Sequence, residues 1–464
     1  MNSHSESHHI KTMGVGDMTL FTVSAILLLD TLAASASIGV SSITWWMIMG
    51  VIFFIPYGLI SAELGTTYPE QGGIYSWIRH AFGTRWGTRA TWCYWLNTAI
   101  WNASIFILFT GVFAQMFFPD LAFSTQLFIA IGMTWLVVLM TSLSLSIGKW
   151  IPNAGATLKT VTFAAIVVGG VMYALQPGVE LANDFSLQAF VPEWGSSTQY
   201  VSTIIYGMLG FELMSSASEE MKNPQRDIPR SIFSSGIVIF LSYILGTFAI
   251  LAVIPAADIN LVEGLVDTMR LLFGDSQLGQ MAALTLGIFA LFTFFYNATT
   301  WAIGSNRAAA ESGADGELPN LFAFENRNNG APIGATIMMG IVSTGVLLGY
   351  GAIAGSNEDL FWSLFAASAV LFILPYIAVV GAFYRARQID SERNRPFRVP
   401  GSNGVALGMS GLCIFLLLLT ALLFMYIPGS GFDWPVVIGS GSCILRGEVA
   451  MRFAESVNRR DSAN

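Results

Sequence analysis

The chain has 464 residues, of which 54% are hydrophobic and only 11% are charged, and its mean hydropathy is +0.62. Typical soluble domains are about 45–50% apolar and about 25% charged, so this composition excludes an ordinary soluble fold. The formal net charge of −8 is informative only through its distribution along the chain. We expect no cofactor and no nucleic-acid partner.

Long apolar runs recur along the whole chain, near the ~20 residues that cross a bilayer as one helix. Continuous apolar runs favour helices over a membrane β-barrel, whose strands alternate apolar and polar residues. We therefore predict an all-α integral membrane protein of about twelve spans, of which the last is the weakest. The expected spans are 15–38, 43–63, 89–117, 124–147, 153–175, 197–220, 230–254, 279–306, 333–354, 360–384, 404–427 and 434–452.

The polar segment 1–13 is expected to be a cytoplasmic tail. If it is cytoplasmic, the predicted outside segments hold only one basic residue, Arg270, and all other Lys and Arg residues near span ends face inside. A Lys/Arg bias of this kind sets the orientation of spans. The sequence thus predicts a multi-pass protein of a bacterial inner membrane, with both termini in the cytoplasm.

Several classes of membrane protein lack support in the sequence. An ATP-driven pump needs a GxxxxGK[ST] loop, which is absent. The histidines are His4, His8 and His9 in the tail and His80, so no histidine-based catalytic site is expected within the bilayer. No repeated filter or charged ring typical of a channel is found. The three cysteines, Cys93, Cys413 and Cys443, indicate neither disulfides nor a metal cluster. A secondary transporter remains.

Secondary transporters typically bind substrate where two helices in corresponding halves of the chain are broken. Two stretches of small residues fit this pattern: 29–39 in the first span, with Asp30, and 206–216 in the sixth, with Glu212. Carboxylates at membrane depth persist mainly where they function. Their separation by five spans fits two inverted repeats, which we place at 14–195 and 196–387, followed by 388–464.

Broken helices offer backbone groups to both ends of an amino acid. Half-helix N-termini attract a carboxylate, and unwound carbonyls accept hydrogen bonds from an ammonium group. The expected backbone of this site is contributed by Ser35, Ala36, Ser37, Gly207 and Gly210. Simple helix packing is the alternative explanation for small residues in such stretches.

Two segments of the sequence then resemble a known superfamily. Gly210-Phe211-Glu212 and the following stretch 219–230 are similar to the sixth helix and next loop of the amino acid/polyamine/organocation (APC) superfamily. Residues 69–77 resemble its P-x-x-G-G-x-Y-x-W segment after the second helix. The resemblance covers about residues 14–427. It implies a leucine-transporter-type fold, and exchange or proton-linked uptake of amino acids by rocking of a helix bundle against a scaffold.

Within the superfamily, three stretches look most similar to the glutamate/GABA antiporter group: 54–58, 253–255 and 397–401. By resemblance to arginine/agmatine relatives, Glu212 is implicated in proton coupling and Tyr206 in an aromatic gate over the substrate. Asn102 matches an asparagine of the substrate site in the same relatives.

Four further positions follow from the resemblance. Lys159 matches the fifth-helix lysine that takes the place of a sodium ion in sodium-independent members. Trp301 matches the eighth helix, so Tyr296 and Asn297 are expected to face the site. For the asparagines and aromatic residues the alternative role is helix packing, and Lys159 has the alternative of snorkelling toward the membrane surface.

The first span departs from the superfamily pattern. In place of a glycine-rich break it has Ala33, Ala34, Ser35, Ala36 and Ser37. It also carries Asp30, an acid that the resemblance does not predict. Two interpretations stay open: the added carboxylate selects a cationic substrate, or it pairs with Lys159 and neutralises both charges.

The leading hypothesis is therefore a sodium-independent transporter of amino acids or related amines, working by antiport or by proton coupling. A sodium-coupled symporter and a non-transporting nutrient sensor with the same fold are the alternatives. We predict no enzymatic activity.

Overall fold

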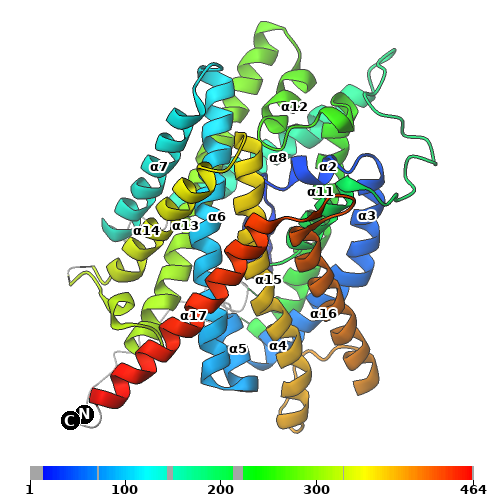
Figure 1. The fold of residues 1–464 in the computed structure, drawn as a ribbon. Coiled ribbons are helices and arrows are strands. Elements are labelled where there is room, and N and C mark those ends of the chain that lie inside the picture. The colour runs from blue at the N-terminus through cyan, green and yellow to red at the C-terminus, as the bar shows by residue number, and fades with distance from the viewer. Residues whose placement is uncertain (1–13, 70–72, 144–149, 213–222, 328, 462–464) are drawn as a thin grey trace.

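The computed structural model describes residues 14–69, 73–143, 150–212, 223–327 and 329–461. This part of the chain is almost entirely helical (Figure 1). The tail with its three histidines, the middle of the P-x-x-G-G segment and residues 219–222 of the loop after the sixth span lie outside the described residues.

Nine helical stretches in the described part are long and apolar enough to cross a membrane, which confirms a multi-pass all-α protein. The first span is too interrupted to count among them, and α17 (Trp434–Asp461) falls outside the set. The described part of the sixth span, up to residue 212, forms only a 3₁₀ turn and one short helix, and residues 213–220 of this span lie outside the described residues. The number twelve therefore stays a prediction. The nine are Ser41–Thr67, Thr84–Phe117, Phe123–Leu143, Gly155–Ala174, Pro224–Val253, Gln277–Ala314, Ile333–Gly351, Asn357–Ile389 and Asn403–Met425.

The helices of the first predicted repeat begin with α1 (Val15–Ile26) and α2 (Leu32–Ala36). The second span consists of α3 (Ser41–Met49), a π-helical turn (Gly50–Phe54) and α4 (Ile55–Thr67). They are followed by α5 (Gly73–Phe82), α6 (Thr84–Phe117), α7 (Phe123–Leu143) and α8 (Trp150–Ala174).

The second predicted repeat starts with a 3₁₀ turn (Ser196–Tyr200) and α9 (Val201–Tyr206). It continues with α11 (Pro224–Val253), a 3₁₀ turn (Ala256–Asp258), α12 (Gly264–Phe273), α13 (Gln277–Ala314), a 3₁₀ turn (Asn320–Ala323), α14 (Ile333–Gly351) and α15 (Asn357–Ile389). A short hairpin of two strands with two residues each, β1 (Tyr426–Ile427) and β2 (Gly431–Phe432), joins α16 (Asn403–Met425) to α17.

Two long helices, α6 and α15, form the centre of the molecule. They pack along each other, and α13, α14 and α7 lie on one side of them while α3, α11 and α16 lie on the other (Figure 1). Large side chains such as Trp95 and Phe365 are fully buried here. By contrast, large apolar side chains such as Phe128, Phe233 and Phe415 are exposed on the outside, as expected for a surface that faces lipid.

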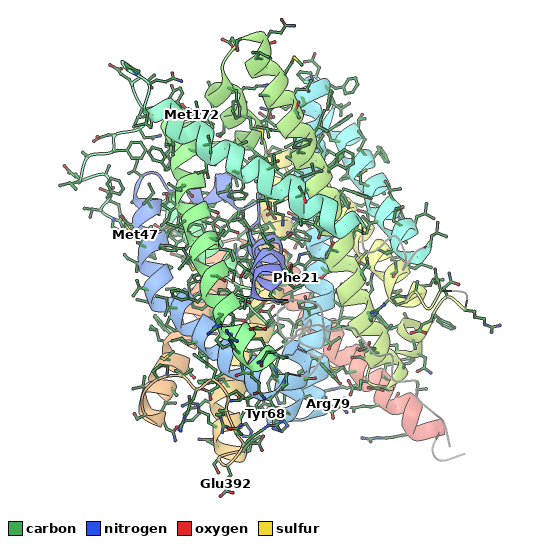
Figure 2. All side chains as sticks on the ribbon, turned by 180° about the vertical axis from the view of Figure 1, so that it is seen from behind. Phe21, Met47, Tyr68, Arg79, Met172 and Glu392 are labelled. Atoms are coloured by element: carbon green, nitrogen blue, oxygen red, sulfur yellow. The ribbon has the colours of Figure 1, made fainter. Side chains whose placement is uncertain are left out.

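Segments that the prediction places on one side of the membrane lie at the same end of the molecule. Tyr68, Arg79 and Glu392, from segments predicted to lie inside, gather at one end, and Met172 lies at the other (Figure 2). We call the end with Arg79 the inner end.

A buried ion cluster joins α4 to α15 at the inner end. The carboxylate of Glu63, whose side chain is 2% exposed, binds the guanidinium groups of Arg387 at 2.5 Å and Arg395 at 3.2 Å. It also accepts a hydrogen bond from the backbone N–H of Val399 over 2.7 Å. Two cations and one amide thus compensate a buried carboxylate, whose desolvation would otherwise destabilise the fold.

Next to it, α5 is attached to the end of α15. Asp390 accepts a hydrogen bond from the hydroxyl of Tyr68 over 2.7 Å, and its Oδ2 lies 2.7 Å from Nε2 of His80. The hydrogen bond from Tyr68 and the bond from His80 hold the pKa of Asp390 below its ordinary value.

Candidate substrate site at two interrupted helices

The first span is interrupted at residues 27–31, between α1 and α2. An interruption was expected in this span, but the prediction that Ala33 to Ser37 form it is wrong, because residues 32–36 are the helix α2. The hydroxyls of Ser35 and Ser37 donate to the carbonyls of Leu32 and Ala33, each over 2.9 Å. Such local bonds are compatible with a helical turn.

The hydrogen bonds that stabilise the interruption come from another helix. Tyr243 of α11 donates its hydroxyl to the carbonyl of Ile26 and accepts from the N–H of Leu28, both over 2.9 Å. One turn later, Oγ1 of Thr247 lies 3.3 Å from Oγ of Ser35. Sequence reasoning missed Tyr243. The available signal was a pair of polar residues at i and i+4, on one face of a long apolar run.

The sixth span is interrupted after Tyr206, as predicted, and this break meets the first one. Gly210 has φ +123°, a conformation that favours glycine, and a Cβ there would lie 2.8 Å from Cγ1 of Ile26. A Cβ on Gly207 would lie 3.2 Å from the hydroxyl of Tyr243. The backbone of Gly210 therefore lies against the end of α1. The backbone of Gly207 lies against Tyr243, which forms a hydrogen bond with the end of α1.

Asp30 lies inside the first interruption, with a side chain only 4% exposed. Its Oδ2 accepts a hydrogen bond from Nε1 of Trp101 over 3.1 Å. Lys159 is close enough to interact electrostatically with Asp30, but its ammonium group donates to the carbonyl of Ser24 over 2.6 Å. Both residues are described, and they form no ion pair within 4 Å, so the direct Asp30–Lys159 pair considered above is not formed.

Glu212 lies at the second interruption and is 3% exposed. Its Oε1 accepts from the hydroxyl of Tyr376 on α15 over 2.5 Å, and its Oε2 accepts from the hydroxyl of Tyr57 on α4 over 3.1 Å. The carboxylate thus links the interrupted sixth span to two other helices.

An aromatic cluster connects the surroundings of the two carboxylates. The ring centroids of Trp101 and Trp301 are 6.3 Å apart, those of Trp301 and Phe372 are 5.7 Å apart, and those of Phe372 and Tyr376 are 4.8 Å apart. Tyr206 contacts Phe372 with centroids 5.4 Å apart. The cluster therefore runs from the hydrogen-bond partner of Asp30 to one of the partners of Glu212, and it includes two of the predicted aromatic residues, Tyr206 and Trp301.

Three further predicted site residues, Asn102, Tyr296 and Asn297, are in contact with other helices or buried. Asn102 points to α14, where its Nδ2 lies 3.6 Å from Sδ of Met339, and the neighbouring Trp101 faces Asp30 instead. Tyr296 packs over Gly155 of α8, and its hydroxyl is in reach of Ser24. Asn297 is buried.

The remaining small and aromatic residues that were predicted for the site are in packing contacts with neighbouring helices. Phe211 stacks on Phe54 with centroids 4.8 Å apart, toward the second span. Ala33 faces Gly264 of α12. Ala34 and Ala36 are buried in α2, which packs against α9, α11 and α12.

Two interrupted spans that meet at Gly210 and Ile26 and that each carry a buried carboxylate, within a bundle of apolar helices, define a secondary-transporter type of membrane protein. Comparison with known proteins agrees. Residues 14–445 match the family model described as "Amino acid permease". The chain belongs to this family, and so to the APC superfamily that the motifs indicated.

Individual relatives have more specific descriptions. A probable agmatine/putrescine antiporter of Lactococcus lactis is 37% identical over 442 residues, which is 93% of each chain. A polyamine transporter of Oryza sativa is 26% identical, covering 89% of this chain and 73% of that protein. A glutamate/gamma-aminobutyrate antiporter of Lactococcus lactis is 23% identical, covering 88% of this chain and 82% of that protein.

Proposed function

We propose that the chain is a sodium-independent secondary antiporter that exchanges amino acids or related amines across a bacterial inner membrane, with both termini in the cytoplasm. The observation that carries this proposal is the meeting of two interrupted spans at Gly210 and Ile26, each span with a buried carboxylate, Asp30 or Glu212. Intramembrane carboxylates at such a point bind or couple charged ligands. Agmatine and putrescine are the first substrates to test, because a relative with 37% identity is described by them.

Lys159 supports independence from sodium. Its ammonium group is fixed on the carbonyl of Ser24, in the last turns of α1, over 2.6 Å. A cation held by the protein at the start of an interruption supplies the positive charge that a bound sodium ion would supply there. Exchange is therefore expected without sodium.

Glu212 supports a coupling role. The two hydroxyls on its carboxylate come from α4 and α15, so its bonding is sensitive to the relative position of three helices. We infer that Glu212 carries the proton where transport is proton-coupled, and that its contacts with Tyr57 and Tyr376 change during alternating access. The two inverted repeats, 14–195 and 196–387, would rock about these contacts.

Counterflow in proteoliposomes tests the proposal. Vesicles containing purified protein are loaded with unlabelled putrescine and placed in radiolabelled agmatine, in choline medium and in sodium medium. We expect the label to accumulate equally in both media, and not in empty vesicles. Parallel vesicles test arginine, ornithine, glutamate and GABA.

Three results would contradict the proposal. Accumulation only in sodium medium would establish the symporter. Saturable binding without any flux would establish the nutrient sensor. The absence of exchange with every amine and amino acid, in vesicles whose orientation and protein content are verified, would exclude an amine or amino acid antiporter.

A further inference from the structure

The two buried carboxylates of the site differ in how they are bonded. Both oxygens of Glu212 accept hydrogen bonds from tyrosine hydroxyls. Asp30 has one bond from another side chain, from Trp101 to Oδ2. Among the described residues, no Lys, Arg or His nitrogen lies within 4 Å of its oxygens. Asp30 is thus a buried carboxyl group without an ion-pair partner among the described residues.

A carboxylate in this position is costly unless a cation pairs with it. The nearest candidate within the protein, Lys159, has its ammonium group directed at the carbonyl of Ser24. The indole of Trp101 donates one neutral hydrogen bond, which orients the carboxylate and does not neutralise it. The described part of the chain therefore leaves the carboxylate of Asp30 without a paired cation.

The surroundings of Asp30 suit the remainder of such a substrate. Trp101 begins the aromatic cluster, which continues through Trp301 and Phe372. Aromatic faces attract an ammonium group and pack against an aliphatic chain. The tyrosine rings of Tyr206 and Tyr94 contact Phe372 at 5.4 and 6.1 Å between centroids. An amine with a short aliphatic body therefore finds a carboxylate and an apolar wall side by side.

We propose that Asp30 determines the specificity of the site: its carboxylate binds the ammonium group of the substrate and repels a substrate carboxylate. The site therefore takes an amine in preference to the amino acid from which decarboxylation would produce it. This inference rests on the proposed antiporter function and adds the residue that chooses between the two substrate classes named there.

Two pairs of compounds isolate this choice. Agmatine differs from arginine, and putrescine from ornithine, only by the absence of the α-carboxylate. The measurement is competition by each unlabelled compound against uptake of radiolabelled agmatine in proteoliposomes. We expect wild-type protein to favour the amine at least about 30-fold in each pair. The reason is that a substrate carboxylate buried beside the like charge of Asp30 typically weakens the affinity by that factor or more.

The test variant is Asp30→Asn, which keeps the size of the side chain and removes its charge. Its amine-to-amino-acid ratio is expected to fall at least about tenfold, through weaker binding of the amine and better binding of the amino acid. Asp30→Glu keeps the charge and is expected to retain a preference for the amine. Asp258→Asn, at an exposed residue of the turn before α12, is the matched control and is expected to leave the ratio unchanged.

The ratio within one preparation does not depend on the amount of active protein, so a role in folding alone would not change it. An unchanged ratio in Asp30→Asn, or a wild-type preference for the amino acids, would overturn the inference while the antiporter function stands. If neither amines nor amino acids exchange in the wild type, the proposed function itself fails.

If Asp30→Asn does not fold, Trp101→Phe replaces it. This variant keeps an aromatic ring, with phenyl in place of indole, and removes the hydrogen bond to Oδ2. The amine preference is expected to fall about tenfold or more, which corresponds to the loss of one hydrogen bond to a charged group. A ratio equal to that of the wild type in Trp101→Phe would then overturn the inference.

Discussion

The hydroxyl of Tyr243 donates a hydrogen bond to the carbonyl of Ile26, the last residue of α1, over 2.9 Å. The same oxygen accepts from the N–H of Leu28. A residue of α11 therefore provides partners for backbone groups on both sides of the point where the first span stops being helical. In a membrane interior, such groups have no water to replace a missing partner.

Removal of this hydroxyl is expected to destabilise the protein. Tyr243→Phe keeps the ring that stacks on Trp46 and leaves a buried carbonyl and a buried N–H without a partner. The expected loss is about 1–3 kcal/mol of stability, seen as a lower thermal unfolding temperature in detergent and slower exchange in vesicles. Tyr384→Phe is the control, because Tyr384 makes no side-chain hydrogen bond within the described residues. Equal unfolding temperatures for the two variants would contradict the prediction.

The ion cluster at the inner end provides a second test. Glu63→Gln leaves Arg387 and Arg395 without their common carboxylate, in surroundings where the side chains are 5% and 9% exposed. Breaking a buried pair from one side typically costs 3–5 kcal/mol, so we expect a loss of about 3 kcal/mol or more. Thermal unfolding measures it.

The matched control for Glu63→Gln is Glu392→Gln. Glu392 is exposed at the same end of the molecule (Figure 2), and its loss is expected to change stability by less than about 0.5 kcal/mol. If both variants unfold at the wild-type temperature, the cluster does not stabilise the fold.

Lys159 is expected to be required for exchange. Lys159→Met retains most of the volume of the side chain but removes the ammonium group from the carbonyl of Ser24, so the end of α1 loses a charge-assisted bond. A bond of that kind contributes about 1.5–3 kcal/mol, and we expect exchange to fall about tenfold or more. Initial rates in choline medium measure the effect. Wild-type rates in the variant would assign Lys159 a packing role only.

The bond between Tyr68 and Asp390 predicts a dependence of stability on pH. The pKa of Asp390 in the folded protein is held below its ordinary value. The ionised carboxylate therefore stabilises the folded state above about pH 4, the ordinary pKa of an aspartate. This contribution is lost as the pH falls through the lower pKa of the folded state. Asp390 is partly exposed, so the expected size is about 1 kcal/mol or less.

The measurement is the difference in unfolding temperature between wild type and Asp390→Asn across pH 3 to pH 8, in detergent. We expect the wild type to be more stable at neutral pH and the difference to shrink toward pH 3. A difference that grows on acidification has the wrong sign and would contradict the role assigned to Asp390. Asp258→Asn controls for the loss of one negative charge.

Much of the fold was predictable because membrane spans are long and uniformly apolar. Five predicted spans coincide with helices to within about four residues at both ends, for example 333–354 with α14 and 404–427 with α16. The helices α6, α11, α13, α15 and α17 extend five to nine residues beyond their predicted spans. The two carboxylates were recognised as candidates because a charge is conspicuous in an apolar run. The interruption after Tyr206 was recognised because of its two glycines.

The position of the first interruption was not predictable from local sequence. Residues 27–29 are three leucines, which favour a helix by themselves. They are not helical because Tyr243, more than 200 residues later, provides the hydrogen bonds that a helix would otherwise make. Likewise, only the rotation of α6 in the fold decides that Trp101 faces Asp30 and that Asn102 faces α14.

The backbone at Gly210 leaves no space for a side chain against Ile26. The frame formed by the two interruptions is therefore fixed, since a substitution there would push the two spans apart before it altered any contact with a substrate. Asp30 and Tyr206 border this frame through buried side chains. If Asp30 chooses the substrate as proposed, a single replacement there would change the substrate without moving the two spans.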